Sequence, residues 1–305
     1  MQLNNHNFGP RFGVAYALNE KTILRGGYGY YYSLLERFGS ENQLGLNPPF
    51  LINKIPAVAG NSKTPILVVQ NGFPLGFVDP ASVTLSQLQA FHIRAVNPHQ
   101  PAPNVQQWSV GFQRELPMHF TADVNYVGTK STHLDVLNDL NQPTFNHGVT
   151  TNISPFPNFG YIEYQNSIGY GNYNGLEATL SRRSTNGFSF RAAYTYSHSL
   201  DNAPQELENN SGAPPEGRNY SGWYGRSDFD VPQRVSFNYV YELPFGKGKA
   251  FAREGLLGYV LGGFRTSGVY TLYNGRPFTI NGGGLSSVLD PYGAAMRPST
   301  GLVRR

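Results

Sequence analysis

Apolar and polar residues alternate with a period of two along three stretches of the chain. In residues 120–126 one set is Phe120, Ala122, Val124 and Tyr126, and the other is Thr121, Asp123 and Asn125. Residues 188–197 and 235–243 show the same alternation. Because successive side chains of a strand point to opposite faces, the pattern predicts strands with one aromatic-rich face and one polar face. A wall with lipid on one side and water on the other needs this combination.

Extending the pattern along the chain predicts eight strands, each paired antiparallel with its sequence neighbours. They span residues 11–18, 21–32, 106–115, 120–134, 173–183, 188–198, 233–243 and 263–274. The connections after the even-numbered strands are long and cover residues 33–104, 135–172 and 199–231. Short turns alternating with long loops predict an all-β fold, an antiparallel up-and-down transmembrane β-barrel segment with short periplasmic turns and long extracellular loops.

Lengths add two further expectations. A tilted strand crosses a bilayer in about 9–11 residues, so the longer strands are expected to project beyond the membrane as a hairpin stalk. Loops as long as residues 33–104 are improbable inside a compact soluble domain. Within this loop, residues 80–91 predict a short helix with Ser82 or Thr84 as its cap.

Composition agrees with a membrane barrel. Charged residues make up 14% of the chain, against roughly 25% in soluble domains, while Gly and Pro number 35 and 22. No apolar run reaches the 18 or so residues of a helical span. The chain has no cysteine, and its net charge of +4 is scattered rather than clustered, so nucleic-acid binding is not expected. The first residues do not form a signal peptide, which an outer-membrane protein needs, so a fragment is expected.

The two faces are assigned from the alternation. Six apolar side chains are expected to face outward, namely Phe120, Val124, Leu180, Phe188, Phe190 and Phe237. Tyrosines near the strand ends fit interfacial girdles, namely Tyr28, Tyr30, Tyr126, Tyr194, Tyr196, Tyr239 and Tyr241. Seven polar side chains are expected to face the lumen, namely Asp123, Asn125, Glu177, Arg191, Asn238, Glu242 and Arg265. These either hold a plug and line a solute path, or simply hydrate a wide barrel.

Candidate chemistry is sparse. No HExxH, GxSxG or phosphate-loop motif is present, so neither an enzyme nor a bound metal or cofactor is expected. Loop residues His92, His99, Trp223 and Tyr224 are candidates for contact with an extracellular ligand, and the two histidines are otherwise solvated loop residues. Asp228 and Asp230 beside Arg226 and Arg234 predict either an ion-pair or calcium cluster, or a turn in which Asp accepts backbone N–H groups. Lys247, Lys249 and Arg253 are expected to solvate a periplasmic turn.

Eight blocks of sequence, in order, resemble the barrel of TonB-dependent outer-membrane receptors, most closely the Oar-like branch. They are residues 8–16 (FGPRFGVAY), 22–32 (TILRGGYGYYY), 107–117 (QWSVGFQRELP), 125–134 (NYVGTKSTHL), 172–176 (NYNGL), 227–234 (SDFDVPQR), 242–248 (ELPFGKG) and 274–278 (NGRPF). The resemblance covers nearly the whole chain except residues 33–104. Receptors of this family have about 22 strands, a plug and a TonB box, and no segment here resembles the last two.

The resemblance implies that residues 1–305 are one partial receptor barrel, with residues 33–104 as a long extracellular loop. The implied location is the outer membrane of a Gram-negative bacterium. The implied function is uptake of a large solute, a glycan, peptide or chelate, energised by the TonB complex through a region outside these residues. The alternative is a passive porin or an adhesin that binds through its loops, because a closed eight-stranded barrel can stand alone. Outer-membrane lipid is the other expected partner.

Overall fold

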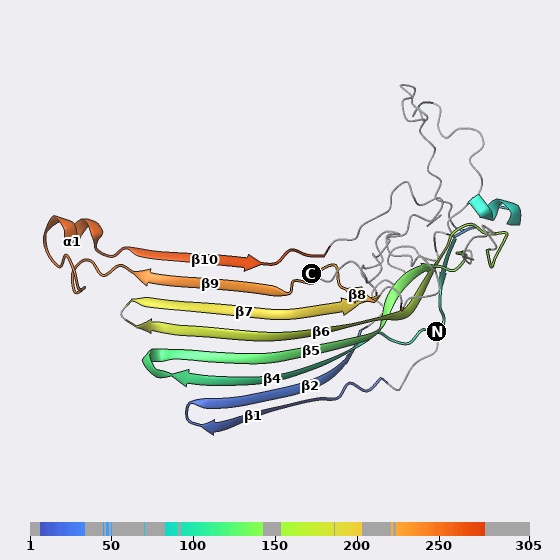
Figure 1. The fold of residues 1–305 in the computed structure, drawn as a ribbon. Helices are drawn as coiled ribbons and strands as arrows, with labels where there is room; N and C mark the ends of the chain where they lie inside the picture. The colour runs from blue at the N-terminus through green and yellow to red at the C-terminus, as the bar shows by residue number, and fades with distance from the viewer. Residues whose placement is uncertain are drawn as a thin grey trace, which may run out of the picture.

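One mostly antiparallel sheet forms the body of the protein in the computed structural model (Figure 1). The structure describes residues 7–33, 45, 47–48, 50, 70, 83–90, 93–142, 154–185, 187–202, 221 and 224–277. Within them the sheet has ten strands, and the main path runs β1-β2-β4-β5-β6-β7-β9-β10. β1 and β10 end this path, so each has one paired edge within the described residues.

The strand bounds follow the predicted ones closely at the short-turn end, whereas β5 and β6 extend well beyond them at the other end. The strands are β1 (Arg11–Asn19), β2 (Thr22–Tyr32), β3 (Ile93–Val96), β4 (Asn104–Leu116), β5 (Phe120–Asp139), β6 (Ile162–Thr185), β7 (Phe188–Asp201), β8 (Gly225–Arg226), β9 (Gln233–Glu242) and β10 (Arg265–Tyr273). The helices are η3 (Leu85–Ala90), η4 (Pro117–His119) and α1 (Gly255–Leu261). All eight predicted strands are confirmed; β3 and β8 are additional. None of the described helices is long and apolar enough to cross a membrane.

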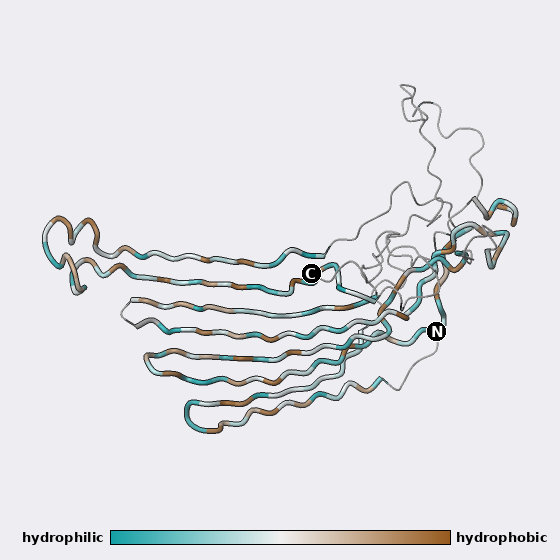
Figure 2. The backbone as a smooth tube through the Cα atoms, in the orientation of Figure 1, coloured by the Kyte–Doolittle hydropathy of each residue, from teal (hydrophilic) through white to brown (hydrophobic). Residues whose placement is uncertain are grey.

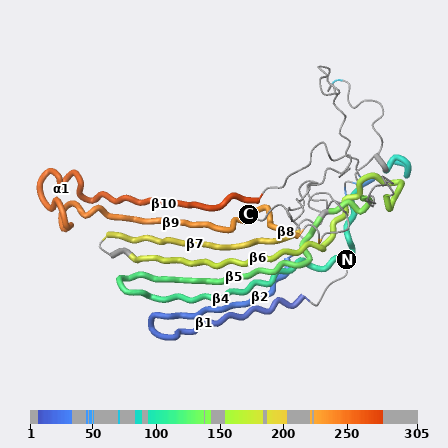
Figure 3. The backbone as a smooth tube through the Cα atoms, in the orientation of Figure 1, coloured from blue at the N-terminus to red at the C-terminus, as the bar shows by residue number. Residues whose placement is uncertain are grey.

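The short connections lie at one end of the sheet, and the ends of β2, β5 and β7 that lead into the longer connections lie at the other, as Figure 3 shows. Between β1 and β2 the Asn19 side chain accepts the Lys21 N–H at 3.0 Å. Between β4 and β5, Met118 and His119 adopt left-handed backbone angles, with φ of 62° and 63°. Tight turns of this kind join neighbouring antiparallel strands directly, which is why the predicted pairing is confirmed along the main path.

Two predictions about the loop end need correction. β5 and β6 continue pairing out to Asp139 and Glu163, so much of the expected loop 135–172 is a projecting hairpin. β3 pairs with β6 in parallel, so the prediction that strands pair only with sequence neighbours is wrong at this point. The predicted helix is confirmed as the shorter η3, which begins directly after Thr84. The Gln87 side chain accepts hydrogen bonds from the Thr84 N–H at 2.8 Å and from the Thr84 hydroxyl at 3.0 Å.

Polar contacts hold the projecting hairpin together. The Asn47 side chain accepts the Arg94 N–H at 2.8 Å and donates to the Arg94 carbonyl at 2.7 Å. These two hydrogen bonds are the ones that a neighbouring strand would make with the free edge of β3. Arg94 also contacts Glu163 at 3.4 Å. Burial raises the pKa of Asp135 above its usual value, although Ser167 donates a hydrogen bond to it. Backbone pairing supported by side chains explains why this hairpin lacks the apolar alternation that marks the other strands.

The sheet separates apolar from polar residues between its two faces. Directly paired residues of antiparallel strands share a face, and the register places all six residues predicted to face outward on one face. All seven girdle tyrosines lie on the same face. Its side chains are unusually exposed, Phe12 and Leu272 at 70%. Figure 2 shows the resulting alternation of hydropathy along the strands.

One glycine on this apolar face is covered by an aromatic ring. Gly128 lies directly opposite Trp108, and a Cβ added to Gly128 would approach Trp108 Cε2 to 2.2 Å. We expect Gly128→Ala to displace the indole, shift the tryptophan emission and lower the free energy of unfolding by about 1 kcal/mol. Gly26→Ala is the matched control, because its nearest neighbours would be 3.6 Å away. Equal midpoints in urea for the two variants would contradict this packing role.

Candidate functional site: the polar face of the sheet

The face opposite the apolar one carries every residue predicted to face the lumen. Cross-strand pairs align Asn125 with Glu177, Arg191 with Asn238, and Glu242 with Arg265. Asp123 lies two residues before Asn125 and so shares its face. The sequence therefore brought together seven side chains from five strands on one surface.

Contacts among these residues are local. The Asn125 amide donates to the Asp123 carboxylate and lies over Gly111, its cross-strand partner. Near the short-turn end, Glu242 accepts from Lys249 at 3.0 Å and from Arg265 at 2.8 Å. Lys249 is thus ion-paired rather than simply solvated as expected.

A hollow of about 820 Å³ opens on the polar face at the end that bears the long connections. Register aligns its floor across four strands, since Thr195 pairs with both Glu177 and Arg234, and Arg234 pairs with Tyr273. The rest of the lining comes from Tyr173, Ser197, Ser199, residues 229–231 and Arg276. The hollow combines two carboxylates, one of them the buried Asp230, with two guanidinium groups and aromatic rings. This set suits a polar solute with flat or ring-shaped parts.

Of the predicted face residues, only Glu177 lines this hollow. Sequence reasoning placed Arg234 only in the expected cluster with Asp228 and Asp230, and it missed Tyr273 and Arg276. Strand alternation and the register of the short turns would place Arg234 and Tyr273 on the same face and at the same level as Glu177. Arg276 follows the end of β10, where alternation gives no guidance.

The wall of the hollow is held by a buried carboxylate. β8 and β9 both pair with the same edge of β7, and residues 227–232 bulge out between them. Asp230, 2% exposed, accepts the Ser199 N–H at 2.9 Å, which the bulge would leave without a strand partner. It also contacts Arg226 at 2.8 Å and His198 at 3.2 Å. Asp230 therefore accepts a backbone N–H and also forms an ion pair with Arg226. The turn and the ion pair that the sequence predicted as alternatives are thus both present.

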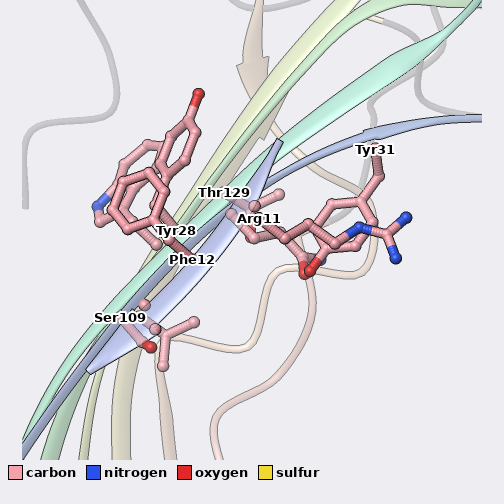
Figure 4. A pocket seen from close by; sticks show the side chains of 12 residues that line it. Arg11, Phe12, Tyr28, Tyr31, Ser109 and Thr129 are labelled. Atoms are coloured by element: carbon pink, nitrogen blue, oxygen red, sulfur yellow. The ribbon is translucent and has the colours of Figure 1, made fainter. Parts of the chain in front are cut away.

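A second hollow of about 450 Å³ lies near the β1 edge (Figure 4). Gly13, Gly27 and Gly29 leave space there. The Arg11 guanidinium lies over the Tyr31 ring, 4.5 Å from its centroid, and Figure 4 shows these two side chains on the other side of the strand from Phe12 and Tyr28. Sequence reasoning did not single out this cation–π pair.

The residues predicted to contact an extracellular ligand lie in different surroundings. His99 is exposed, and its N–H donates to Asn97 at 2.9 Å. Tyr224 stacks on Tyr170, a residue of the apolar face, with ring centroids 5.2 Å apart, and burial raises its pKa. His92 and Trp223 lie outside the described residues. No group of three or more His, Asp or Glu side chains suited to a metal ion occurs in the part of the chain that the structure describes.

Comparison with known families decides the class. A family model described as an outer membrane β-barrel domain matches residues 1–301. The chain belongs to this family. It is therefore an outer-membrane protein of a Gram-negative bacterium, and its sheet is part of a transmembrane barrel wall. A comparison with curated protein sequences gave no match.

Solved structures with a similar fold are large outer-membrane proteins. The siderophore receptor PirA from Pseudomonas aeruginosa is 14% identical with a TM-score of 0.41, over 90% of this chain and 37% of that one. The outer membrane transporter YddB from Escherichia coli is 14% identical with a TM-score of 0.42, over 78% and 27%. The FrpB iron transporter from Neisseria meningitidis (F3-3 variant) is 14% identical with a TM-score of 0.39, over 78% and 24%. The chain thus spans well under half of each.

Proposed function

We propose that this chain is part of the barrel of a TonB-dependent receptor of the Oar-like branch, which takes up a large solute. The observation that carries the proposal is the hollow on the polar face, which joins Glu177, Arg234 and Tyr273 at the end of the long loops. Its polar and aromatic lining would contact a solute that has passed the loops. In this proposal the polar face is the inner wall of the barrel, and no covalent chemistry takes place there.

One further observation supports a receptor-sized barrel rather than a narrow porin. β1 and β10 are the opposite ends of the sheet path, and neither pairs with the other. Unpaired strand edges cannot remain in lipid, because their N–H and C=O groups would have no partners. We propose that further strands of the complete protein close the wall, and that its plug and TonB-contacting region lie outside residues 1–305.

Uptake measurements test the proposal. Cells that make the complete protein are given fluorescent oligosaccharide and oligopeptide pools too large for general porins, with and without a protonophore. We expect accumulation that the protonophore abolishes, because transport through TonB uses the proton gradient. An Arg234→Ala variant should take up less solute at equal surface abundance. Uptake that persists with the protonophore would favour the porin alternative, and surface binding without uptake would favour the adhesin.

A further inference from the structure

The connection between β9 and β10 carries the most apolar exposed segment at the short-turn end. Its helix α1 has the sequence GLLGYVL and no buried residue. Leu256 is 80% exposed and Tyr259 is 89% exposed, and Phe251 and Phe264 beside the helix are also exposed. Figure 2 shows the helix in brown beyond the turns of the other hairpins. A water-facing turn has no need of such a surface.

This segment is held in a defined position. The Gly246 N–H donates to the Phe251 carbonyl at 3.1 Å, and the Phe251 N–H donates to the Pro244 carbonyl at 2.9 Å. Gly246, with φ of 103°, packs against Gly262, and a Cβ at Gly246 would approach the Gly262 Cα to 2.7 Å. The backbone therefore presents the apolar side chains at a fixed place relative to the end of the barrel wall.

The apolar surface of the connection continues the lipid-facing surface of the sheet. The Leu243 N–H donates to the Phe264 carbonyl at 2.9 Å, which extends the β9–β10 register by one pair beyond Glu242 and Arg265. Glu242 and Arg265 belong to the polar face, so alternation places Leu243 and Phe264 on the apolar face. Lys247 and Arg253, both exposed, come before the helix in the chain, and the Arg253 side chain donates a hydrogen bond to the Lys249 carbonyl at 3.0 Å.

We propose that α1 and its neighbours lie in the headgroup region of the periplasmic leaflet, bound to anionic phospholipid. Leu256, Leu257 and Tyr259 enter the boundary between headgroups and acyl chains, as the apolar side of an interfacial helix does. Lys247 and Arg253 reach the lipid phosphates. The segment thus anchors one sector of the barrel wall at a fixed depth. This inference is independent of the proposed transport function, because it concerns the outer surface of any barrel that contains this hairpin.

Site-directed spin labelling of the complete protein in vesicles tests the proposal. Residues 1–305 contain no cysteine, so Leu257→Cys introduces a single labelling position within them. Glu20→Cys, in the β1–β2 turn at the same end, is the matched control. Accessibility to oxygen, which partitions into lipid, is compared with accessibility to a water-soluble nickel chelate. We expect the oxygen-to-nickel ratio at position 257 to be several-fold higher than at position 20.

Lipid composition and charge reversal distinguish whether anionic lipid, water or another protein surrounds α1. The ratio at position 257 should be higher in phosphatidylglycerol-containing vesicles than in pure phosphatidylcholine, and Lys247→Glu combined with Arg253→Glu should remove that difference. Equal ratios at positions 257 and 20 would mean a hydrated turn and would overturn the proposal. A label at position 257 that is shielded from both reagents would also overturn it, and would indicate that a protein, a second copy or another chain, covers the helix.

Discussion

Arginine in place of Leu176 is expected to destabilise the membrane-inserted protein by about 2–4 kcal/mol, because a cation on the lipid face near the bilayer midplane lacks water. Leu176 lies midway along the part of β6 that pairs with both neighbours, opposite Tyr126 and Tyr196. A midplane position for Leu176 therefore places these two tyrosines in the middle of the wall instead of in an interfacial girdle. Phe190, by contrast, is close to the start of β7, where the same change should cost less.

Thr179→Arg is the matched control for Leu176→Arg. Thr179 lies three residues further along β6 and therefore on the polar face, opposite Asp123. An arginine there meets water and a carboxylate, so the free energy of unfolding should change little. Urea titration of the folded, heat-modifiable form in vesicles measures both variants. A larger loss for Thr179→Arg than for Leu176→Arg would reverse the assignment of the two faces.

Removal of the buried carboxylate at the hollow should have the second-largest effect. Asp230→Ala leaves the Ser199 N–H and the Arg226 guanidinium without their acceptor. We expect a local loss of about 2–3 kcal/mol, the cost of an unmade buried hydrogen bond to a charged group. Half of the Arg226 side chain remains near water, which keeps the loss below that of a fully buried pair.

Hydrogen exchange at the Ser199 amide measures this effect directly. Asp230→Asn retains an oxygen for the Ser199 N–H but removes the charge, so its exchange rate should lie between those of the wild type and Asp230→Ala. Exchange at amides in the β1–β2 hairpin should stay unchanged in both variants. Ser199 protection that is the same in all three proteins would show that the bulge does not depend on this carboxylate.

The alternation of residues was sufficient to predict the wall of the barrel. Strands such as β5 and β7 must expose apolar side chains to lipid and polar ones to water, so their period of two appears in the sequence itself. The same alternation placed Asp123, Glu177 and Arg191 on one face, because short turns leave little freedom in the register of neighbouring strands. The sequence blocks also predicted the outer-membrane class that the family match confirms.

Other features depended on contacts between distant segments. β3 pairs in parallel with β6, and its other edge is hydrogen-bonded by Asn47, a residue far away in the sequence. The hollow forms only where β6, β7, β9 and β10 lie side by side, which brings Glu177 to Arg234 and Tyr273. The role of Asp230 depends on the bulge between β8 and β9, and the exposure of α1 depends on how residues 243–264 fold back on themselves. Local patterns determined which side chains face lipid and which face water, because strand alternation assigns each residue to one face of the sheet. The hollow, by contrast, depends on the register between distant strands, which only the tertiary structure supplies.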